Sequence, residues 1–303
     1  MYIYPFLMSM ALFDLNKKSI QWLTLFLLAF IWGSSFILMK KGLVAYSHTQ
    51  VAALRIGIAS ICLLPFAIKP LLKIEKRYWI YLFIAGFLGN GVPAFLFTKA
   101  QTEVASSLAG MLNSLTPIFT LIIALFVFKS QPKRNQIIGV VVGLLGAFSL
   151  IASNGISIEN SNLLYSLYIV LATFFYGVSV NVIKIKLSTI KPITISAVAF
   201  LCVGPWTLIY LFTTDFVAIT SNNPKAPVSL FYISLLAIFG TAIAMLVFNT
   251  LIKKTTSLFA SSVTYLIPIV SILWGIIDGE PIHFIQIVSV LTILLGIYFT
   301  NKH

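Results

Sequence analysis

The sequence predicts an all-α membrane protein of ten transmembrane helices, arranged as two inverted five-helix repeats. Three observations predict it: an apolar composition, ten apolar segments of spanning length, and an internal repeat. Of the 303 residues, 59% are hydrophobic and 9% are charged, whereas about 25% are charged in an ordinary soluble domain. Polar groups could not cover the surface of so apolar a chain, so most of that surface is expected to face lipid.

The ten apolar segments are long enough to be membrane helices. A helix needs about 20 mostly apolar residues to cross the hydrocarbon. The runs are continuous and lack the alternating pattern of a barrel strand, which favours helices. The predicted spans are residues 20–40, 49–68, 78–98, 104–128, 135–152, 163–185, 192–212, 229–252, 257–277 and 282–300.

The distribution of lysine and arginine predicts the orientation. With a cytoplasmic N-terminus, the inner connections carry 15 of these residues and the outer ones four. Positive residues favour the cytoplasmic side, so both termini are predicted inside. The net charge of +13 comes from lysines that flank apolar segments. Because they form no basic domain, we expect the lipid bilayer as a partner and no nucleic acid.

An internal repeat relates the two halves. The stretches "SLTPIFTLI" (114–122) and "YLIPIVSIL" (265–273) are 151 residues apart, and so are "FLGNGVPAFLF" (87–97) and "IFGTAIAMLVF" (238–248). A shift of 144 places "WGSSFILMK" (32–40) over "YGVSVNVIK" (176–184). Five spans is an odd number, so the second copy enters the membrane inverted. The predicted organisation is a cytoplasmic tail (1–18), a first repeat (19–152), an external linker (153–162) and a second repeat (163–303).

Inverted repeats favour a transport function. Two similar halves of opposite orientation can exchange conformations and open a central site to each side in turn. Pro117 and Pro268 recur at matching places, where each frees a backbone carbonyl and bends its helix. They are therefore interpreted as hinges or cavity-forming notches, with simple packing as the alternative.

Several motifs resemble one transporter family. They are "LAFIWGSSF", "AALRI", "NSLTPIFTLIIALFVF", "FGTAIAMLVF" and "YLIPIVSILWGIIDGEP". Together they resemble the EamA-type members of the drug/metabolite transporter superfamily, over about residues 19–300. The resemblance implies ten helices and export of amino acids or other small metabolites. At position 129 the chain has lysine where that family usually has a glutamate that closes the motif of the first repeat. The corresponding glutamate of the second repeat is present, as Glu280.

Polar and aromatic residues at mid-helix are the candidates for the substrate site. Buried polar groups in hydrocarbon cost several kcal/mol unless paired or hydrated, so they gather around cavities. The alternative is that Ser, Thr and Asn join helices and that Trp and Tyr anchor interfaces. The substrate-binding candidates are Trp32, Ser35, Asn90, Asn113, Ser114, Tyr176, Thr241 and Tyr265, with Ser34, Asn181 and Asn249 as further members of the set.

Three basic residues are candidates for gating or structural charges. Arg55 lies within the second span, roughly 10 Å from its end at 1.5 Å per residue, where it must pair, reach an interface or face water. We favour a structural or gating role for Arg55, although its planar fork could bind a substrate carboxylate. The shift of 144 pairs Lys40 with Lys184 at opposite faces, as interface anchors or gate charges.

What the sequence lacks narrows the function. No Asp or Glu lies at mid-helix in the ten spans, which disfavours proton-coupled transport of cations. The prediction is a secondary transporter in the plasma (inner) membrane. It would move a small metabolite, an amino acid or related apolar zwitterion, in the direction of efflux by alternating access. The main alternative is an importer or exchanger of phosphorylated or nucleotide-type metabolites.

The sequence favours neither a membrane enzyme nor a scaffold. The three histidines are scattered and no acid pair lies at mid-depth, so no catalytic residue, metal or cofactor is expected. An inverted repeat has no evident purpose in a scaffold. Since two five-helix halves can enclose a cavity by themselves, a monomer would suffice.

Overall fold

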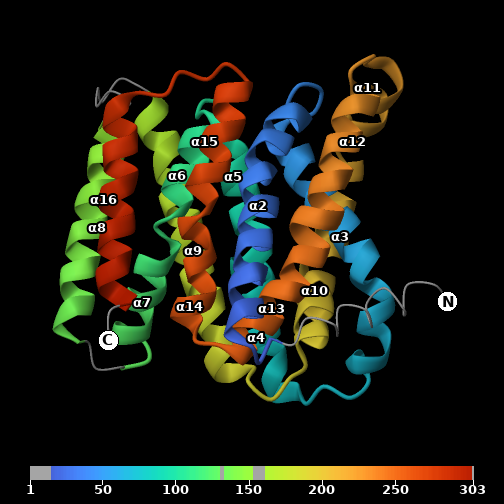
Figure 1. Ribbon diagram of the computed structural model, residues 1–303. Coiled ribbons are helices and arrows are strands. Elements are labelled where there is room, and N and C mark those ends of the chain that lie inside the picture. Colours follow the sequence, from blue (N-terminus) through green and yellow to red (C-terminus); the bar gives the residue numbers. More distant parts are fainter. Residues whose placement is uncertain (1–14, 130–132, 153–160, 302–303) are drawn as a thin grey trace.

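The computed structural model of the protein describes residues 15–129, 133–152 and 161–301, and every regular element in these ranges is helical (Figure 1). The all-α prediction is confirmed for this part of the chain. Most of the predicted tail, up to residue 14, and the predicted linker between residues 153 and 160 lie outside the described residues.

Helices fill both halves of the chain. The first half contains α2 (Lys18–Gly42), α3 (His48–Leu71), α4 (Lys76–Gly86), η2 (Phe87–Gly91), α5 (Val92–Ala100), α6 (Ser106–Asn113), α7 (Thr116–Phe126) and α8 (Arg134–Ala152). The second half contains α9 (Ser161–Lys186), α10 (Pro192–Phe212), α11 (Phe216–Asn222), α12 (Ala226–Ala237), η3 (Ile238–Ile243), α13 (Ala244–Lys254), α14 (Ser257–Ser261), η4 (Ser262–Tyr265), α15 (Ile267–Ile277) and α16 (Phe284–Asn301).

Eight helical stretches in the described residues are long and apolar enough to cross a membrane. They are Lys18–Gly42, His48–Leu71, Lys76–Ala100, Ser106–Phe126, Leu163–Lys186, Pro192–Phe212, Ala226–Lys254 and Phe259–Ile277. The other two predicted spans correspond to α8 and α16, whose apolar stretches Arg134–Leu150 and Phe284–Gly296 are shorter. The helices run alternately up and down, so that α2 begins and α16 ends toward the lower end of the bundle in Figure 1.

Large apolar side chains cover the outside of the bundle. Trp22, Phe26 and Phe30 are 51%, 56% and 59% exposed. Their spacing of four residues keeps them on one face of α2. Such a face suits hydrocarbon, as expected for a helix that spans a bilayer.

Four of the spans are interrupted near their middle. The third and the eighth each contain a π-helical segment, η2 and η3 respectively. The fourth is broken between α6 and α7, and the ninth changes from α14 through the 3₁₀ turn η4 to α15. These interruptions occur at the positions that the 151-residue shift relates.

The two prolines do not lie inside continuous helices that they would kink. Pro117 and Pro268 lie in the first turns of α7 and α15, where a helix N–H has no intrahelical partner and proline is tolerated. The chain is already broken before each proline, so the prolines begin new helices rather than bend continuous ones. Their role as hinges stays a prediction.

The helices α8 and α16 pair closely at the edge of the bundle (Figure 1). A Cβ added at Gly296 would lie 2.4 Å from the backbone nitrogen of Gly143. Only glycine allows two helix backbones to approach this closely, as small residues do at membrane helix interfaces. Ser289 also donates a hydrogen bond of 3.0 Å to Ser149 across the pair.

Candidate functional site: a central cavity

A partly open cavity lies in the middle of the bundle and has a volume of about 80 Å³, which is enough for several water molecules. Both halves of the chain contribute to its lining. The residues around it are Trp32, Ser35, Phe36, Met39, Arg55, Ile56, Gly89, Asn90, Phe97, Asn113, Thr116, Tyr176, Ser179, Val180, Ile183, Gly240, Met245, Phe248, Ser261 and Thr264. We call this space the central cavity.

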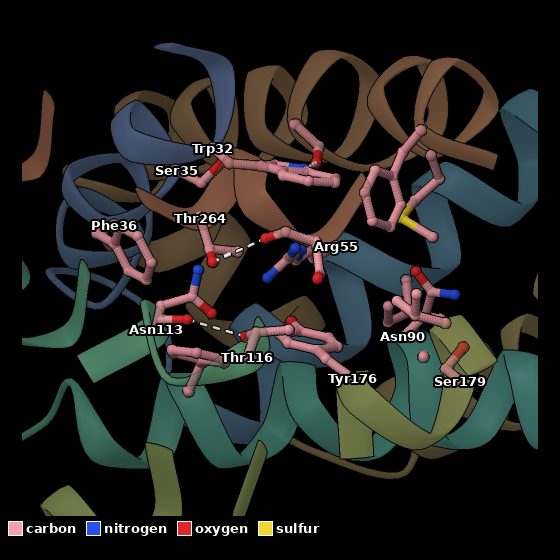
Figure 2. A pocket seen from close by; sticks show the side chains of 18 of the residues that line it. Trp32, Ser35, Phe36, Arg55, Asn90, Asn113, Thr116, Tyr176, Ser179 and Thr264 are labelled. Atoms are coloured by element: carbon pink, nitrogen blue, oxygen red, sulfur yellow. Dashed lines mark hydrogen bonds between the residues drawn. The ribbon is translucent and has the colours of Figure 1, made fainter. Parts of the chain in front are cut away.

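Aromatic rings form two opposite sides of the central cavity (Figure 2). The indole nitrogen of Trp32 donates a hydrogen bond of 2.9 Å to the carbonyl of Gly240, and its ring meets Phe248 edge to face at 4.9 Å. On the other side the ring of Tyr176 stacks on Phe97 at 5.9 Å. Because these contacts fix the rings, the cavity has a rigid apolar lining.

Arg55 is the cation of the cavity lining. Its side chain comes from α3, is only 9% exposed and lies between Trp32 and Tyr176 in Figure 2. Its Nε donates a hydrogen bond of 2.9 Å to Oγ1 of Thr241, its Nη1 lies 4.0 Å from the sulfur of Met39, and the guanidinium also interacts with Tyr176. No carboxylate of the described residues forms an ion pair with it. The guanidinium is therefore held in place without a counter-charge.

Asn113 lies at the break between α6 and α7. It is 5% exposed, and its Oδ1 has no hydrogen-bond partner in the structure. Pro117 cannot donate to the backbone carbonyl of Asn113 because it lacks an N–H. Thr116 Oγ1 donates to that carbonyl instead, at 2.9 Å. The break is thus stabilised locally, while the amide oxygen is left buried without a hydrogen-bond partner.

The π-helical segments bring two further polar residues to the cavity region. Asn90 in η2 donates to the carbonyl of Ala85 at 3.4 Å, and Thr241 in η3 donates to that of Leu236 at 3.1 Å. In both cases the acceptor lies five residues earlier. Each side chain therefore bonds a backbone carbonyl on the widened turn of its π-helix.

Many lining residues come in pairs that the sequence shifts relate. The pairs 32/176, 35/179, 36/180 and 39/183 are 144 residues apart, and the pairs 89/240, 97/248 and 113/264 are 151 residues apart. Arg55 breaks the pattern, because α10, the corresponding helix of the second half, contains no charged residue. The two sides of the cavity therefore use corresponding positions but differ in charge.

Five of the eight substrate-site candidates line the central cavity. These are Trp32, Ser35, Asn90, Asn113 and Tyr176. A sixth, Thr241, lies behind Arg55 as its hydrogen-bond acceptor. The remaining two, Ser114 and Tyr265, directly follow lining residues and are not part of the lining.

Some polar candidates join helices, as the alternative interpretation expects. Ser34 accepts a hydrogen bond of 2.9 Å from Trp274. Asn181 donates to the carbonyl of Thr120 at 2.8 Å, and Asn249 donates to Ser196 at 2.8 Å. None of these three lines the central cavity.

Sequence reasoning missed polar lining residues that the repeat could have found. Ser179 is the mate of Ser35 under the shift of 144, and Thr264 is the mate of Asn113 under the shift of 151. Thr116 had no such signal, because it joins the lining only through the helix break before Pro117.

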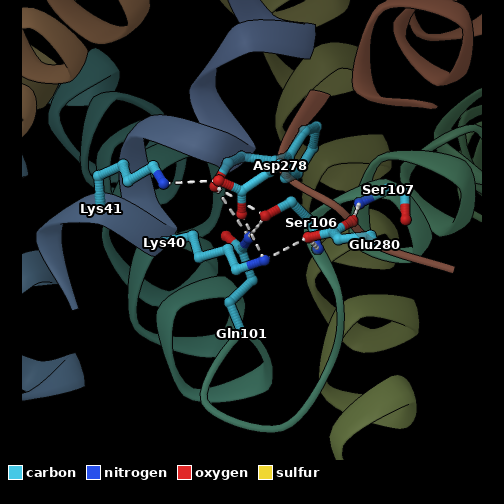
Figure 3. Close-up of polar contacts among 8 residues, drawn as sticks. Lys40, Lys41, Gln101, Ser106, Ser107, Asp278 and Glu280 are labelled. Atoms are coloured by element: carbon cyan, nitrogen blue, oxygen red, sulfur yellow. Dashed lines mark hydrogen bonds and ion pairs between the residues drawn. The ribbon is translucent and has the colours of Figure 1, made fainter. Parts of the chain in front are cut away.

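Lys40 takes part in an ion-pair network at the upper end of the bundle (Figure 3). Its Nζ lies 2.7 Å from Asp278 and 2.8 Å from Glu280, and Lys41 lies 2.5 Å from Asp278. The carboxylate of Glu280 also accepts hydrogen bonds from the backbone N–H groups of Ser106 and Ser107, at 3.0 and 2.9 Å. The ion-pair network (Lys40, Lys41, Asp278 and Glu280) thereby connects α2, the start of α6 and the end of α15.

Both carboxyl groups of the network ionise readily. Hydrogen bonds from Lys40 and Lys41 lower the pKa of Asp278 below its ordinary value. Burial opposes ionisation of Glu280, but the hydrogen bonds from Lys40 and from Ser107 and Ser106 outweigh it and also lower its pKa. Both groups are therefore charged at neutral pH.

Lys184 lies at the opposite end of the bundle and has no acidic partner among the described residues. Its Nζ donates to the carbonyls of Ile252, at 3.0 Å, and Thr255. These carbonyls lie at the C-terminus of α13, where a positive charge is favourable. The two ends of the bundle are thus closed by different chemistry.

The fold and the cavity together define a class of protein. A bundle of lipid-facing apolar helices around a central, partly polar cavity is the architecture of a membrane transporter. The chain belongs to the EamA-like transporter family, which matches residues 19–152 and 163–302. It is a multi-pass transporter of the plasma membrane, consistent with the drug/metabolite transporter superfamily.

Several proteins resemble the chain over most of its length. An uncharacterized transporter of Archaeoglobus fulgidus is 25% identical over 93% of this chain and 99% of its own. The uncharacterized inner membrane transporter YedA of Escherichia coli K12 is 24% identical over 90% of each chain. A probable amino-acid metabolite efflux pump of Salmonella typhimurium is 24% identical over 90% of this chain and 91% of its own. A solved crystal structure shares the fold, with a TM-score of 0.67 at 15% identity, over 94% of this chain and 97% of its own.

Proposed function

We propose that the protein is a secondary transporter that exports a small metabolite, an amino acid or related zwitterion with an apolar side chain, by alternating access. One observation carries the proposal: the central cavity, lined by matched positions of the two halves, combines aromatic walls with a few fixed polar groups. A substrate with an apolar part and a small polar part suits such a lining. The printed name of the Salmonella relative, which refers to amino-acid metabolite efflux, supports the direction and the substrate class.

The proposed topology is ten spans in two inverted repeats, with both termini in the cytoplasm. The repeats would be residues 19–152 and 163–303, with 1–18 as the tail and 153–162 as an external linker. Two family matches of similar length, the alternating direction of the helices and the lysine distribution support this arrangement. The proposed mechanism uses a monomer, because residues from both halves of one chain line the central cavity.

Alternating access assigns roles to the two ends. The ion-pair network would hold the outer side closed, and Lys184 would hold α13 at the inner side. Pro117 and Pro268 mark helix breaks beside the cavity, where the two halves could hinge. Separating the ion pairs exposes charges that water and substrate can then reach, so the network can open without unfolding a helix.

A phosphorylated or nucleotide-type substrate is the second candidate. A phosphate group favours two or more converging basic residues. Arg55 is the single lysine or arginine among the described residues that line the central cavity. The lining therefore supports this substrate class less well than a monocarboxylate.

Counterflow in proteoliposomes tests the proposal. Vesicles containing the purified protein are preloaded with one amino acid at a time, and entry of the labelled amino acid is followed without a proton gradient. Uptake above that of empty vesicles, confined to apolar and aromatic amino acids, is expected, and Trp32→Ala should abolish it. A signal only with phosphorylated sugars or nucleobases would overturn the amino-acid assignment, and no signal with any solute would overturn the transport mechanism.

A further inference from the structure

Resting on the proposed function, a sharper statement about the substrate follows from two buried groups: the guanidinium of Arg55, which forms no ion pair with a described carboxylate, and the amide oxygen of Asn113, which has no hydrogen-bond partner. We propose that the central cavity binds the two backbone groups of an α-amino acid separately: Arg55 binds the carboxylate, and Asn113 with Thr264 binds the ammonium group. The apolar side chain then lies between the aromatic walls.

Arg55 has donors left for a ligand. A guanidinium carries five N–H groups, and Thr241 takes the one on Nε while Met39 offers Nη1 a sulfur at 4.0 Å. The neutral hydroxyls of Thr241 and Tyr176 and the sulfur of Met39 do not balance a charge on a side chain that is only 9% exposed. A buried charge is strongly unfavourable unless it is paired. A carboxylate in the cavity would supply the charge and accept two parallel hydrogen bonds.

The cavity carries charge for one anionic group only. The described lining residues include no second lysine or arginine and no Asp or Glu. A single guanidinium would neutralise only one of the two charges of a dianion, and it would repel a ligand that carries only a positive charge. A monocarboxylate, with or without an ammonium group, is the class that this charge selects.

Acceptors for the ammonium group lie to one side of Arg55. In Figure 2, Asn113 and Thr264 lie together on that side, whereas Asn90 and Ser179 lie on the other. The Oδ1 of Asn113 is closed to solvent and has no hydrogen-bond partner, so turning the amide to point this oxygen into the cavity breaks no hydrogen bond at that atom. Thr264 Oγ1 donates its proton to the carbonyl of Ser261 at 2.9 Å, so its lone pairs remain available as acceptors. An ammonium group has three donors and no acceptor, which this pair of oxygens complements.

The arrangement uses the helix breaks. Asn113 ends α6 and Thr264 lies in η4, and they are mates under the 151-residue shift. Both halves therefore contribute an oxygen to the ammonium site, while only the first half contributes the cation. The substrate would hold the halves together by its backbone groups regardless of its side chain.

Competition binding tests the inference with a matched ligand series. Labelled leucine is bound to the purified protein and displaced by leucine, leucinamide (no carboxylate), 4-methylpentanoate (no ammonium) or 3-methylbutylamine. Leucinamide and 3-methylbutylamine should compete at least about tenfold more weakly than leucine, the fold-change expected for a lost charge-assisted hydrogen bond. The variant Arg55→Gln should lose the preference for leucine over leucinamide.

A second variant keeps the test informative if Arg55→Gln fails to fold. Asn113→Asp places a negative charge beside the ammonium site and should improve competition by 3-methylbutylamine several-fold relative to 4-methylpentanoate. The matched control is Asn249→Asp, because Asn249 is also buried with an unpartnered Oδ1 but lies outside the cavity lining. It should leave the ligand order unchanged.

The outcomes separate the inference from the proposed function. If leucine gives counterflow but leucinamide competes as well as leucine, Arg55 does not bind the carboxylate and the inference is wrong while transport stands. If Asn113→Asp and Asn249→Asp change the ligand order equally, the ammonium site is wrong. If neither leucine nor any other amino acid binds or gives counterflow, the proposed function fails and the inference fails with it.

Discussion

The Nε of Arg55 donates a hydrogen bond of 2.9 Å to Oγ1 of Thr241, so a residue of the second half positions the cation of the first half. The hydroxyl of Thr241 donates in turn to the carbonyl of Leu236 at 3.1 Å. This chain of two bonds fixes the plane of the guanidinium relative to η3. Any movement of η3 during transport would therefore move Arg55 as well.

Replacing Thr241 with valine should weaken substrate binding without removing the charge. Valine keeps the volume but leaves Nε without an acceptor, so the guanidinium loses its fixed orientation. We expect the KM for the transported amino acid to rise at least about tenfold, because a hydrogen bond to a charged group contributes about 1.5–3 kcal/mol. The measurement is concentration-dependent counterflow.

Thr250→Val is the matched control for Thr241→Val. The hydroxyl of Thr250 donates only within its own helix, to the carbonyl of Leu246 at 2.8 Å. Its loss should leave the KM unchanged. Equal effects of the two substitutions would show that the Arg55–Thr241 contact has no part in binding.

The sequence allowed most of the helices and six of the twenty cavity-lining residues to be predicted. Apolar runs predict spans directly, and polar residues inside those runs, such as Asn90, Asn113 and Trp32, predict a cavity because hydrocarbon disfavours them. The interruptions were harder. A π-helical turn and an α-helix have nearly the same hydrophobic pattern, so η2 and η3 could not be distinguished from continuous helices by periodicity.

Contacts between residues far apart in the sequence could not be predicted either. Lys40 and Lys184 were interpreted alike, as mates at opposite faces. In the structure Lys40 meets Asp278 and Glu280 because α2 packs against α15, whereas Lys184 meets helix carbonyls. The positions of the two lysines in the sequence do not predict this difference, since it depends on which helices become neighbours.

Substituting Glu280 with glutamine should loosen the upper end of the bundle. Glutamine can still accept from Ser106 or Ser107 but no longer pairs with the charge of Lys40. In a background with Cys62→Ala and Cys202→Ala, a cysteine introduced by Ser35→Cys reports on access to the cavity. We expect Glu280→Gln to raise its rate of labelling by a thiol reagent several-fold.

The control for Glu280→Gln is Glu75→Gln. Glu75 pairs with Arg77 at 2.9 Å, but both side chains are more than 60% exposed. Exposed ion pairs contribute about 0–1 kcal/mol. In the same Ser35→Cys background, the labelling rate with Glu75→Gln should therefore match the rate without it, and a similar rise in both variants would rule out a specific role for the network.

The contribution of Glu280 to stability should depend on pH in one direction. Its pKa is lowered in the folded protein, so the stabilisation is complete above the ordinary pKa of about 4 and is lost as pH falls through the lowered value. The difference in Tm between the unsubstituted protein and Glu280→Gln should thus be constant from about pH 8 to pH 5. It should shrink only below about pH 4, and a loss already near pH 6 would contradict a lowered pKa.

The close pairing of α8 and α16 should not tolerate a side chain at Gly296. A Cβ there would lie 2.4 Å from the backbone of Gly143, so Gly296→Ile must separate the two helices and break the contact between Ser289 and Ser149. We expect a fall in Tm of several degrees in detergent, measured by size exclusion after heating. Leu295→Phe is the control, because Leu295 is 50% exposed on the lipid-facing side and added volume there meets only detergent. If Gly296→Ile keeps the Tm of the unsubstituted protein while Leu295→Phe lowers it, the two helices do not pack in this register.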